Sequence, residues 1–151
     1  MNQVIQLVVF AVEQQNYALR LSTVERIVRA VEVTPLPKMP EIVLGVVNVQ
    51  GQIIPVVNLR RRFRLPEREI DPSDQLIIAR TSKRTVGLVA DEVRGVIDVT
   101  GEKVTAGGEV VPGLEYVAGV VRLEDGLILI HDLNTFLSLD EEKVLDQALQ
   151  D

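Results

Sequence analysis

The chain of 151 residues contains no cysteine. This absence excludes disulfide bonds, cysteine nucleophiles and cysteine-ligated zinc, and it fits a reducing compartment such as the cytoplasm. A chain of this length can bury roughly 70% of the surface that it exposes when unfolded. We therefore expect a domain that is stable without a disulfide or a metal ion.

Aromatic residues make up only 3% of the chain, and its formal net charge is −6. Both values argue against a general nucleic-acid-binding protein, which usually has a basic face and stacking rings. Long hydrophobic runs are also missing, so no membrane-spanning segment is expected. The segment 1–7 has no basic region followed by an apolar run, so it does not predict a signal peptide. These features predict a soluble, cytoplasmic, globular protein.

Residue patterns typical of catalysis are absent as well. The one histidine, His131, ends an apolar segment just before Asp132, and we interpret it as structural. One histidine cannot build a multi-histidine metal site, and no carboxylates have a recognisable ligand spacing. Neither a phosphate-binding loop nor a Gly-x-Ser-x-Gly motif occurs, and Gly107-Gly108 is interpreted as a surface loop. We therefore expect no catalytic residue, no metal and no cofactor.

Short apolar segments rich in valine, leucine and isoleucine dominate the chain, which predicts an all-β fold of small barrels. An Asp-Gly turn at 124–126 is expected to join the last two segments. The expected strands are Val4–Val12, Tyr17–Leu21, Val28–Val33, Val46–Val49, Ile53–Val57, Leu76–Ala79, Val86–Ala90, Val96–Val99, Val117–Leu123 and Leu127–Ile130.

The sequence also repeats itself. Gly45–Leu59 aligns with Gly119–Leu133, and both copies read Gly-Val-Val, a turn, a second apolar strand, and Asn or Asp before leucine. Asn58 and Asp132 are each placed to N-cap a short helix, at 59–63 and at 133–137. A weaker echo relates Leu19, Val24 and Ile27 to Leu88, Val93 and Val96. Two related lobes are the natural interpretation.

The repeat predicts how the single domain of 1–151 is divided. A segment with two prolines and several charges, 66–73, is expected to connect the lobes. The division has lobe one at roughly 13–70, lobe two at roughly 80–138, strands 4–12 and 74–81 exchanged between them, and a C-terminal helix at 139–149.

Two capping-box patterns predict helix starts, Ser22 with Glu25 and Ser138 with Glu141. The second opens the C-terminal helix, whose apolar stripe is expected to pack onto a barrel. That stripe consists of Val144, Leu145, Ala148 and Leu149.

The run Arg60-Arg61-Arg62-Phe63-Arg64 is the main charge feature. We prefer to interpret it as the solvated face of a short helix, with Leu59 and Phe63 packed inward at i, i+4 spacing. A site for an acidic partner is the second interpretation. Nucleic acid is the third, because the net charge of the chain opposes it.

Within the first repeat, the sequence resembles the signature of the CheW-like domain, Gly-x-x-Asn-x-Arg-Gly-x-x-x-Pro-x-x-Asp/Asn-Leu. The matching residues are Gly45, Asn48, Gly51, Pro55, Asn58 and Leu59. The segments 24–27, 35–37, 86–93 and 119–121 also look like that family. The resemblance covers nearly the whole chain in the right order.

This resemblance implies two intertwined, five-stranded SH3-like barrels and a chemotaxis adaptor without enzymatic activity. The implied partners are the regulatory domain of a CheA-type histidine kinase and the cytoplasmic tip of chemoreceptors, held in a groove between the lobes. The adaptor would lie at the inner face of the membrane through receptor arrays, without inserting into it. A chain of this length has no room for a kinase or receiver domain, so a free-standing adaptor is expected.

The partner-binding residues implied by the resemblance are Val24, Glu25, Gly45, Asn48, Gln50, Gly51 and Ile53. Each also has a structural alternative: turns for the glycines and Asn48, the capping box for Glu25, and core packing for Val24 and Ile53. The family has arginine where this chain has Gln50, so a charge-assisted receptor contact would be missing or relocated. Two other functions stay open, a β-barrel that binds single-stranded nucleic acid and a small-molecule binder or enzyme with a closed polar pocket.

Overall fold

The computed structural model describes residues 3–29, 33–101, 104–106, 117–123 and 126–149. The Gly107-Gly108 loop and two residues of the expected Asp-Gly turn lie outside these ranges. The described strands are β1 Val4–Val12, β2 Gln15–Arg20, β3 Val24–Arg29, β4 Val43–Val49, β5 Gln52–Val57, β6 Gln75–Arg80, β7 Thr85–Ala90, β8 Glu92–Thr100, β9 Val104–Ala106, β10 Val117–Leu123 and β11 Gly126–His131. The helical elements are η1 Leu21–Thr23, α1 Leu59–Arg62, η3 Leu133–Thr135 and α2 Leu139–Leu149.

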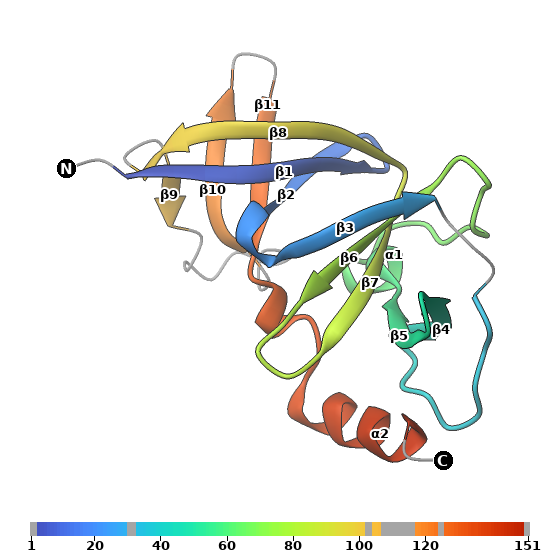
Figure 1. The fold of residues 1–151 in the computed structure, drawn as a ribbon. Coiled ribbons are helices and arrows are strands. Elements are labelled where there is room, and N and C mark those ends of the chain that lie inside the picture. The colour runs from blue at the N-terminus through green and yellow to red at the C-terminus, as the bar shows by residue number, and fades with distance from the viewer. Residues whose placement is uncertain (1–2, 30–32, 102–103, 107–116, 124–125, 150–151) are drawn as a thin grey trace.

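The strands form two sheets, which confirms the all-β fold with two barrels (Figure 1). The first sheet has the order β8-β1-β2-β11-β10-β9, and the second has the order β3-β6-β7-β5-β4. The first sheet therefore has a sixth strand beyond the expected five. This strand, β9, has only three residues. Three residues are too few for an alternation of apolar and polar side chains to be recognised in a sequence.

Each strand of the second sheet has a counterpart in the first, because β3-β6-β7-β5-β4 follows the same pairing pattern as β8-β1-β2-β11-β10. The equivalence extends to irregularities. The ladder between β4 and β5 shifts register between Val43 and Gly45, and the ladder between β10 and β11 shifts between Val117 and Gly119. The sequence repeat thus produces a repeat of strand order and of bulge position.

Whole hairpins are exchanged between the halves of the chain. The β1–β2 hairpin pairs with β8 and β11, and the β6–β7 hairpin pairs with β3 and β5. The expected lobe limits put β2 in lobe one (13–70) and β7 in lobe two (80–138). The sheets instead place β2 with β8 and β11, and β7 with β3 and β5. A hairpin with a short turn keeps its two strands together, so β2 follows β1 and β7 follows β6.

The core has three parts, because the central strands are buried on both faces. Alternate residues of β1 enter different clusters: Leu7 and Val9 face the interior of the first barrel, whereas Phe10 and Val12 enter a central cluster. The central cluster also holds Ile77 and Leu88 of the second sheet and side chains of α2. A third cluster, around Ile54 and Ile78, fills the second barrel. The two barrels therefore share the central cluster, and each also has an interior of its own.

The predicted N-caps of the short helices are confirmed. The Asn58 side chain accepts a hydrogen bond from the Arg61 N–H at 3.1 Å, and the Asp132 side chain accepts one from the Asn134 N–H at 3.1 Å. The second helix is a 3-10 turn of three residues, shorter than the 133–137 that was expected.

Of the two predicted capping boxes, only the one at Ser138 is formed. The Ser138 Oγ accepts from the Glu141 N–H at 3.1 Å, and the Glu141 carboxylate accepts from the Ser138 N–H at 2.8 Å. The box at Ser22 is wrong, because Glu25 lies in β3, whose first residue pairs with Ala79 of β6. Tertiary strand pairing overrides the local helix signal here.

Helix α2 packs back onto the barrels, as predicted, at the lower edge of Figure 1. Its anchor is Leu145, which is fully buried, whereas Val144 of the predicted stripe is 40% exposed. Ion pairs accompany this packing: Arg62 with Glu141 at 2.6 Å, Arg84 with Glu142 at 3.2 Å, and Arg84 with Asp146. Among the described residues, no helix has the length and apolarity needed to cross a membrane.

Candidate protein-binding surface

Most of the expected partner-binding residues lie at one end of the second sheet. The antiparallel pairs of β6 with β3 and β7, and the parallel pair of β5 with β7, put the starts of β3, β5 and β7 at the same end. Val24 and Glu25 begin β3 there. Asn48, Gln50 and Gly51 lie at or next to the turn between β4 and β5. The strand directions thus gather residues that are far apart in the sequence.

The turn between β4 and β5 explains two of these residues structurally. Gln50 and Gly51 are the only residues between the paired Val49 and Gln52, and their φ angles are +51° and +86°. Two positive φ angles in a two-residue loop match the twist of the flanking strands. The Asn48 side chain accepts a hydrogen bond from the Gly51 N–H at 2.9 Å. Gly51 and Asn48 therefore shape the turn, while Gln50 is exposed.

Ile53, in β5 opposite Asn48, is the large apolar side chain that this end exposes, with 51% of its surface accessible. Val24 is half-buried and packs against the central cluster. Glu25 is exposed, and its carboxylate accepts a hydrogen bond from the Thr85 hydroxyl at 3.3 Å. We define the sheet-end surface as Glu25, Asn48, Gln50 and Ile53.

Gly45 does not belong to this surface, because it is buried. Its φ angle is +153°, and a Cβ atom at this position would lie 2.4 Å from the carbonyl oxygen of Thr34. Thr34 and Val46 exchange backbone hydrogen bonds of 2.9 Å, which bring the two segments together. The structural interpretation of Gly45 is therefore the one that the geometry supports.

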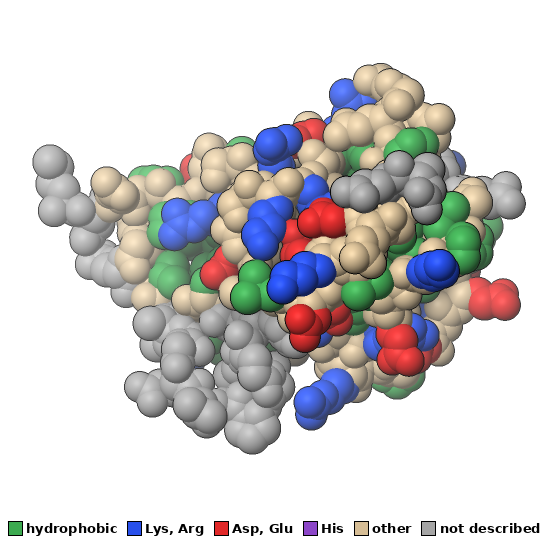
Figure 2. All heavy atoms as spheres, turned by 90° about the horizontal axis from the view of Figure 1, so that it is seen from below, with side chains coloured by type: hydrophobic (Ala, Val, Ile, Leu, Met, Phe, Trp, Pro, Cys, Tyr) green, Lys and Arg blue, Asp and Glu red, His purple; other side chains and the backbone are tan. Residues whose placement is uncertain are grey.

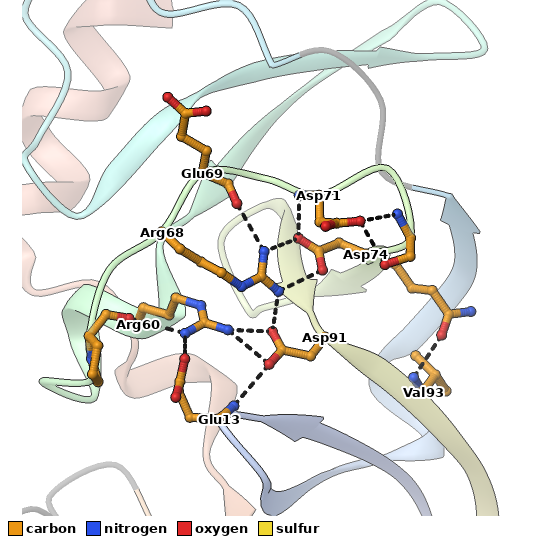
Figure 3. A network of polar contacts seen from close by, with 11 residues as sticks. Glu13, Arg60, Arg68, Glu69, Asp71, Asp74, Asp91 and Val93 are labelled. Carbon is orange, nitrogen blue, oxygen red and sulfur yellow. Dashed lines mark hydrogen bonds and ion pairs between the residues drawn. The ribbon is translucent and has the colours of Figure 1, made fainter.

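The arginine run is largely engaged within the chain. Arg60 is buried, with 7% of its surface exposed, which contradicts its expected place on a solvated helix face. Its guanidinium donates to both oxygens of Asp91 at 2.7 and 2.8 Å, to the carbonyl of Pro66 at 3.0 Å, and to Glu13 (Figure 3). A buried guanidinium needs such partners, because an unpaired charge would be costly to desolvate.

A second arginine extends this network. Arg68 donates to Asp74 at 2.8 and 3.0 Å and to Asp91 at 2.9 Å (Figure 3). Burial alone would raise the pKa of Asp91, but the Glu13 N–H and the two arginines together hold it below its usual value. The network connects the β1–β2 turn of the first sheet to α1 and the β7–β8 junction, so it joins the two barrels.

The neighbouring arginines are also paired, Arg61 with Glu67 at 2.8 Å and Arg62 with Glu141 at 2.6 Å. Figure 2 shows basic and acidic side chains interspersed over one face of the molecule. The interpretations of the run as an acidic-partner site or a nucleic-acid site therefore lose their main support.

His131 packs in an aromatic cluster at the wall of a hollow between the sheets. The side chain is buried, and its ring stacks on Phe63 with centroids 4.4 Å apart. Tyr17 and Phe136 flank it at 5.0 and 5.5 Å. The structural interpretation of His131 is confirmed. The described ranges contain no group of three or more His, Cys, Asp or Glu side chains that could hold a metal ion.

The resemblance implies a groove between the lobes, but the sequence did not identify the residues that line it. One hollow of about 350 Å³ is lined by residues of both sheets, including Arg20, Arg80 and Ile130. A second hollow of about 310 Å³ adjoins it through Arg20 and runs along the start of β1. Arg20 and Arg80 are exposed and form no ion pair in the described part of the chain. No local pattern marks these residues, since only the exchanged topology brings them together.

Comparison with known proteins gives a consistent result. The family model of the CheW-like domain matches residues 6–141. The chain is 31% identical over 142 residues to the chemotaxis protein CheW of Treponema pallidum, covering 90% of this chain and 84% of that protein. It is 32% identical over 146 residues to that of Bacillus subtilis, covering 94% of each. The crystal structure of the scaffolding protein TtCheW from Thermoanaerobacter tengcongensis superposes with a TM-score of 0.82 at 27% identity, covering 92% of this chain and 91% of that one.

Proposed function

Because the chain belongs to the CheW-like domain family, we propose that it is a non-catalytic chemotaxis adaptor that couples chemoreceptors to a CheA-type histidine kinase. In this role it works in the cytoplasm, at the inner face of the membrane, through protein–protein contacts alone. The observation that carries the proposal is that the family match spans both barrels and their exchanged hairpins.

The chain has two separate surfaces, and we assign one to each partner. The sheet-end surface exposes Ile53 among polar side chains, a pattern typical of a contact with another folded domain, and we assign it to the kinase regulatory domain. The groove formed by the two adjoining hollows carries Arg20 and Arg80, which have no ion-pair partner among the described residues, and we assign it to the receptor tip. Both residues can donate charge-assisted hydrogen bonds to acidic side chains of a helical hairpin.

The proposal is tested by co-sedimentation. Membrane vesicles that contain a chemoreceptor from the same cell are mixed with the CheA-type kinase, with and without this chain. We expect the kinase to sediment with the vesicles only when the chain is present. Equal sedimentation of the kinase in both mixtures, or failure of the chain to bind either protein, would contradict the adaptor function.

The repeat offers a matched control for the kinase surface. Ile53 and Leu127 occupy equivalent positions in the two copies and are 51% and 44% exposed. Ile53→Asp should weaken kinase binding at least tenfold, because a central apolar contact is replaced by a charge that must be desolvated. Leu127→Asp should leave kinase affinity unchanged, and neither change should weaken receptor binding. Equal effects of the two substitutions would remove the sheet-end surface from the kinase contact.

A further inference from the structure

A cavity of about 200 Å³ lies beneath the start of α2, away from the sheet-end surface and next to the inter-sheet groove, with which it shares Leu133 and Asn134. Its apolar wall is formed by residues that are far apart in the sequence and are brought together by the fold. The apolar lining residues are Val57, Val86, Leu133, Phe136, Leu137 and Leu139. Apolar cavities of about 150 Å³ in other proteins stay dry and take up benzene. The volume and the lining here therefore suit a group the size of one aromatic ring.

One side of the cavity is polar, and some of its hydrogen-bonding groups are already bonded to other groups of the chain. The Thr81 hydroxyl is used, since it donates to the Arg84 carbonyl at 3.0 Å and accepts from the Lys83 and Arg84 N–H groups. The Ser82 N–H donates to the Asn134 side chain at 2.8 Å. The Ser82 hydroxyl and the Lys83 ammonium have no bonding partner in the part of the chain that the structure describes.

The charge at this rim favours an anion. Glu142 also lines the cavity, and its carboxylate is paired at 3.2 Å with Arg84, which also pairs with Asp146. Lys83 is the charged lining residue that has no ion-pair partner among the described residues, and it lies next to the Ser82 hydroxyl. A carboxylate at this position would accept from both groups.

We propose that this cavity binds a small carboxylate with an aromatic or branched apolar body, the body beneath α2 and the carboxylate against Lys83 and Ser82. The Leu139 side chain, 70% exposed at the start of α2, forms part of the cavity mouth. Binding here does not depend on the adaptor role. None of the lining residues belongs to the sheet-end surface, and the two arginines of the inter-sheet groove, Arg20 and Arg80, do not line this cavity.

The test uses three probes of one shape and different charge: benzoate, benzyl alcohol and benzylammonium. Titrations are followed by the methyl NMR signals of Val86, Leu133 and Leu139. We expect saturable shifts at these methyls with benzoate, weaker binding of benzyl alcohol by roughly threefold, and the weakest binding with benzylammonium. Absence of saturable shifts with benzoate, or the same affinity for all three probes, would overturn the proposal.

Two variants and one control variant locate the probe. Lys83→Gln should reduce the affinity for benzoate to that for benzyl alcohol, while Lys143→Gln, an exposed lysine on α2 outside the lining, should leave it unchanged. Val86→Ile adds one methylene to the wall and should weaken all three probes. If Lys83→Gln and Lys143→Gln act alike, or if Val86→Ile binds benzoate as the unchanged chain does, the site is not this cavity.

Discussion

Gly45 and Gly51 both have positive φ angles, but the space around them differs. A side chain at Gly45 meets the Thr34 backbone, whereas nothing lies within 4 Å of a Cβ at Gly51. We therefore expect Gly45→Ala to lower the free energy of unfolding by roughly 3 kcal/mol and Gly51→Ala by only about 1 kcal/mol. Urea denaturation measures both values. If the two substitutions cost the same, the close approach to Thr34 does not contribute to stability.

Asp91 gives the stability a defined pH dependence. Its pKa is lowered in the folded chain, so its stabilising contribution is present above the unfolded-state pKa of about 3.9 and is lost as the pH falls through the folded-state pKa. Asp91→Asn should lower the free energy of unfolding by roughly 2–3 kcal/mol at neutral pH, because Arg60 loses its bidentate partner. The difference from the unchanged chain should shrink below about pH 4.

The measurement is urea denaturation at a series of pH values. Asp98→Asn is the matched control, since Asp98 is exposed on β8 and forms no ion pair within the described ranges. It should change the stability by less than about 0.5 kcal/mol at any pH. A cost of Asp91→Asn that stays constant from neutral to acid pH would show that the carboxylate charge is not what stabilises the network.

At the scale of elements, helix α2 depends on one buried apolar side chain. Leu145 is fully buried in the central cluster, while its neighbour Val144 is 40% exposed. Leu145→Ala should lower the free energy of unfolding by roughly 2–4 kcal/mol, through lost burial and the cavity left behind. Val144→Ala should stay within about 0.5 kcal/mol, because alanine favours the helix and little apolar burial is lost. Thermal denaturation monitored by circular dichroism compares them, and similar losses for both would mean that the helix packs through a different face.

Elements with a strong local pattern could be predicted from the sequence. Val4–Val12, Val117–Leu123 and the helix at 139–149 have the predicted boundaries, because their apolar patterns and the Ser138 cap are local signals. The strand expected at 28–33 begins instead at Val24, since pairing with β6 decides its position. The partners of Arg60 could not be predicted, because Glu13 and Asp91 lie 47 and 31 residues away in the sequence. Within the expected site, the turn at 48–51 could be predicted from its motif. The burial of Gly45 could not be predicted, because it depends on the contact with Thr34.

At the scale of the whole molecule, the shared core predicts one cooperative unfolding transition. The central cluster contains residues of both sheets, so unfolding of either barrel would expose buried apolar side chains of the other. Because the chain has no tryptophan, Val96→Trp can report on the first sheet and Ile53→Trp on the second, both at exposed positions. Fluorescence of the two variants in urea should give the same midpoint as circular dichroism. Separated midpoints would show that the barrels unfold independently.

The exchanged hairpins also affect how the chain must fold while it is being made. The β1–β2 hairpin leaves the ribosome before one of its sheet neighbours, β11, which begins only at Gly126. At a synthesis rate of 5 to 20 residues per second, the hairpin waits roughly 5 to 20 s for that strand. During this interval β1 exposes the apolar residues that the finished protein buries on both faces. The nascent N-terminal segment is therefore a natural client for chaperones that bind extended apolar chains at the ribosome.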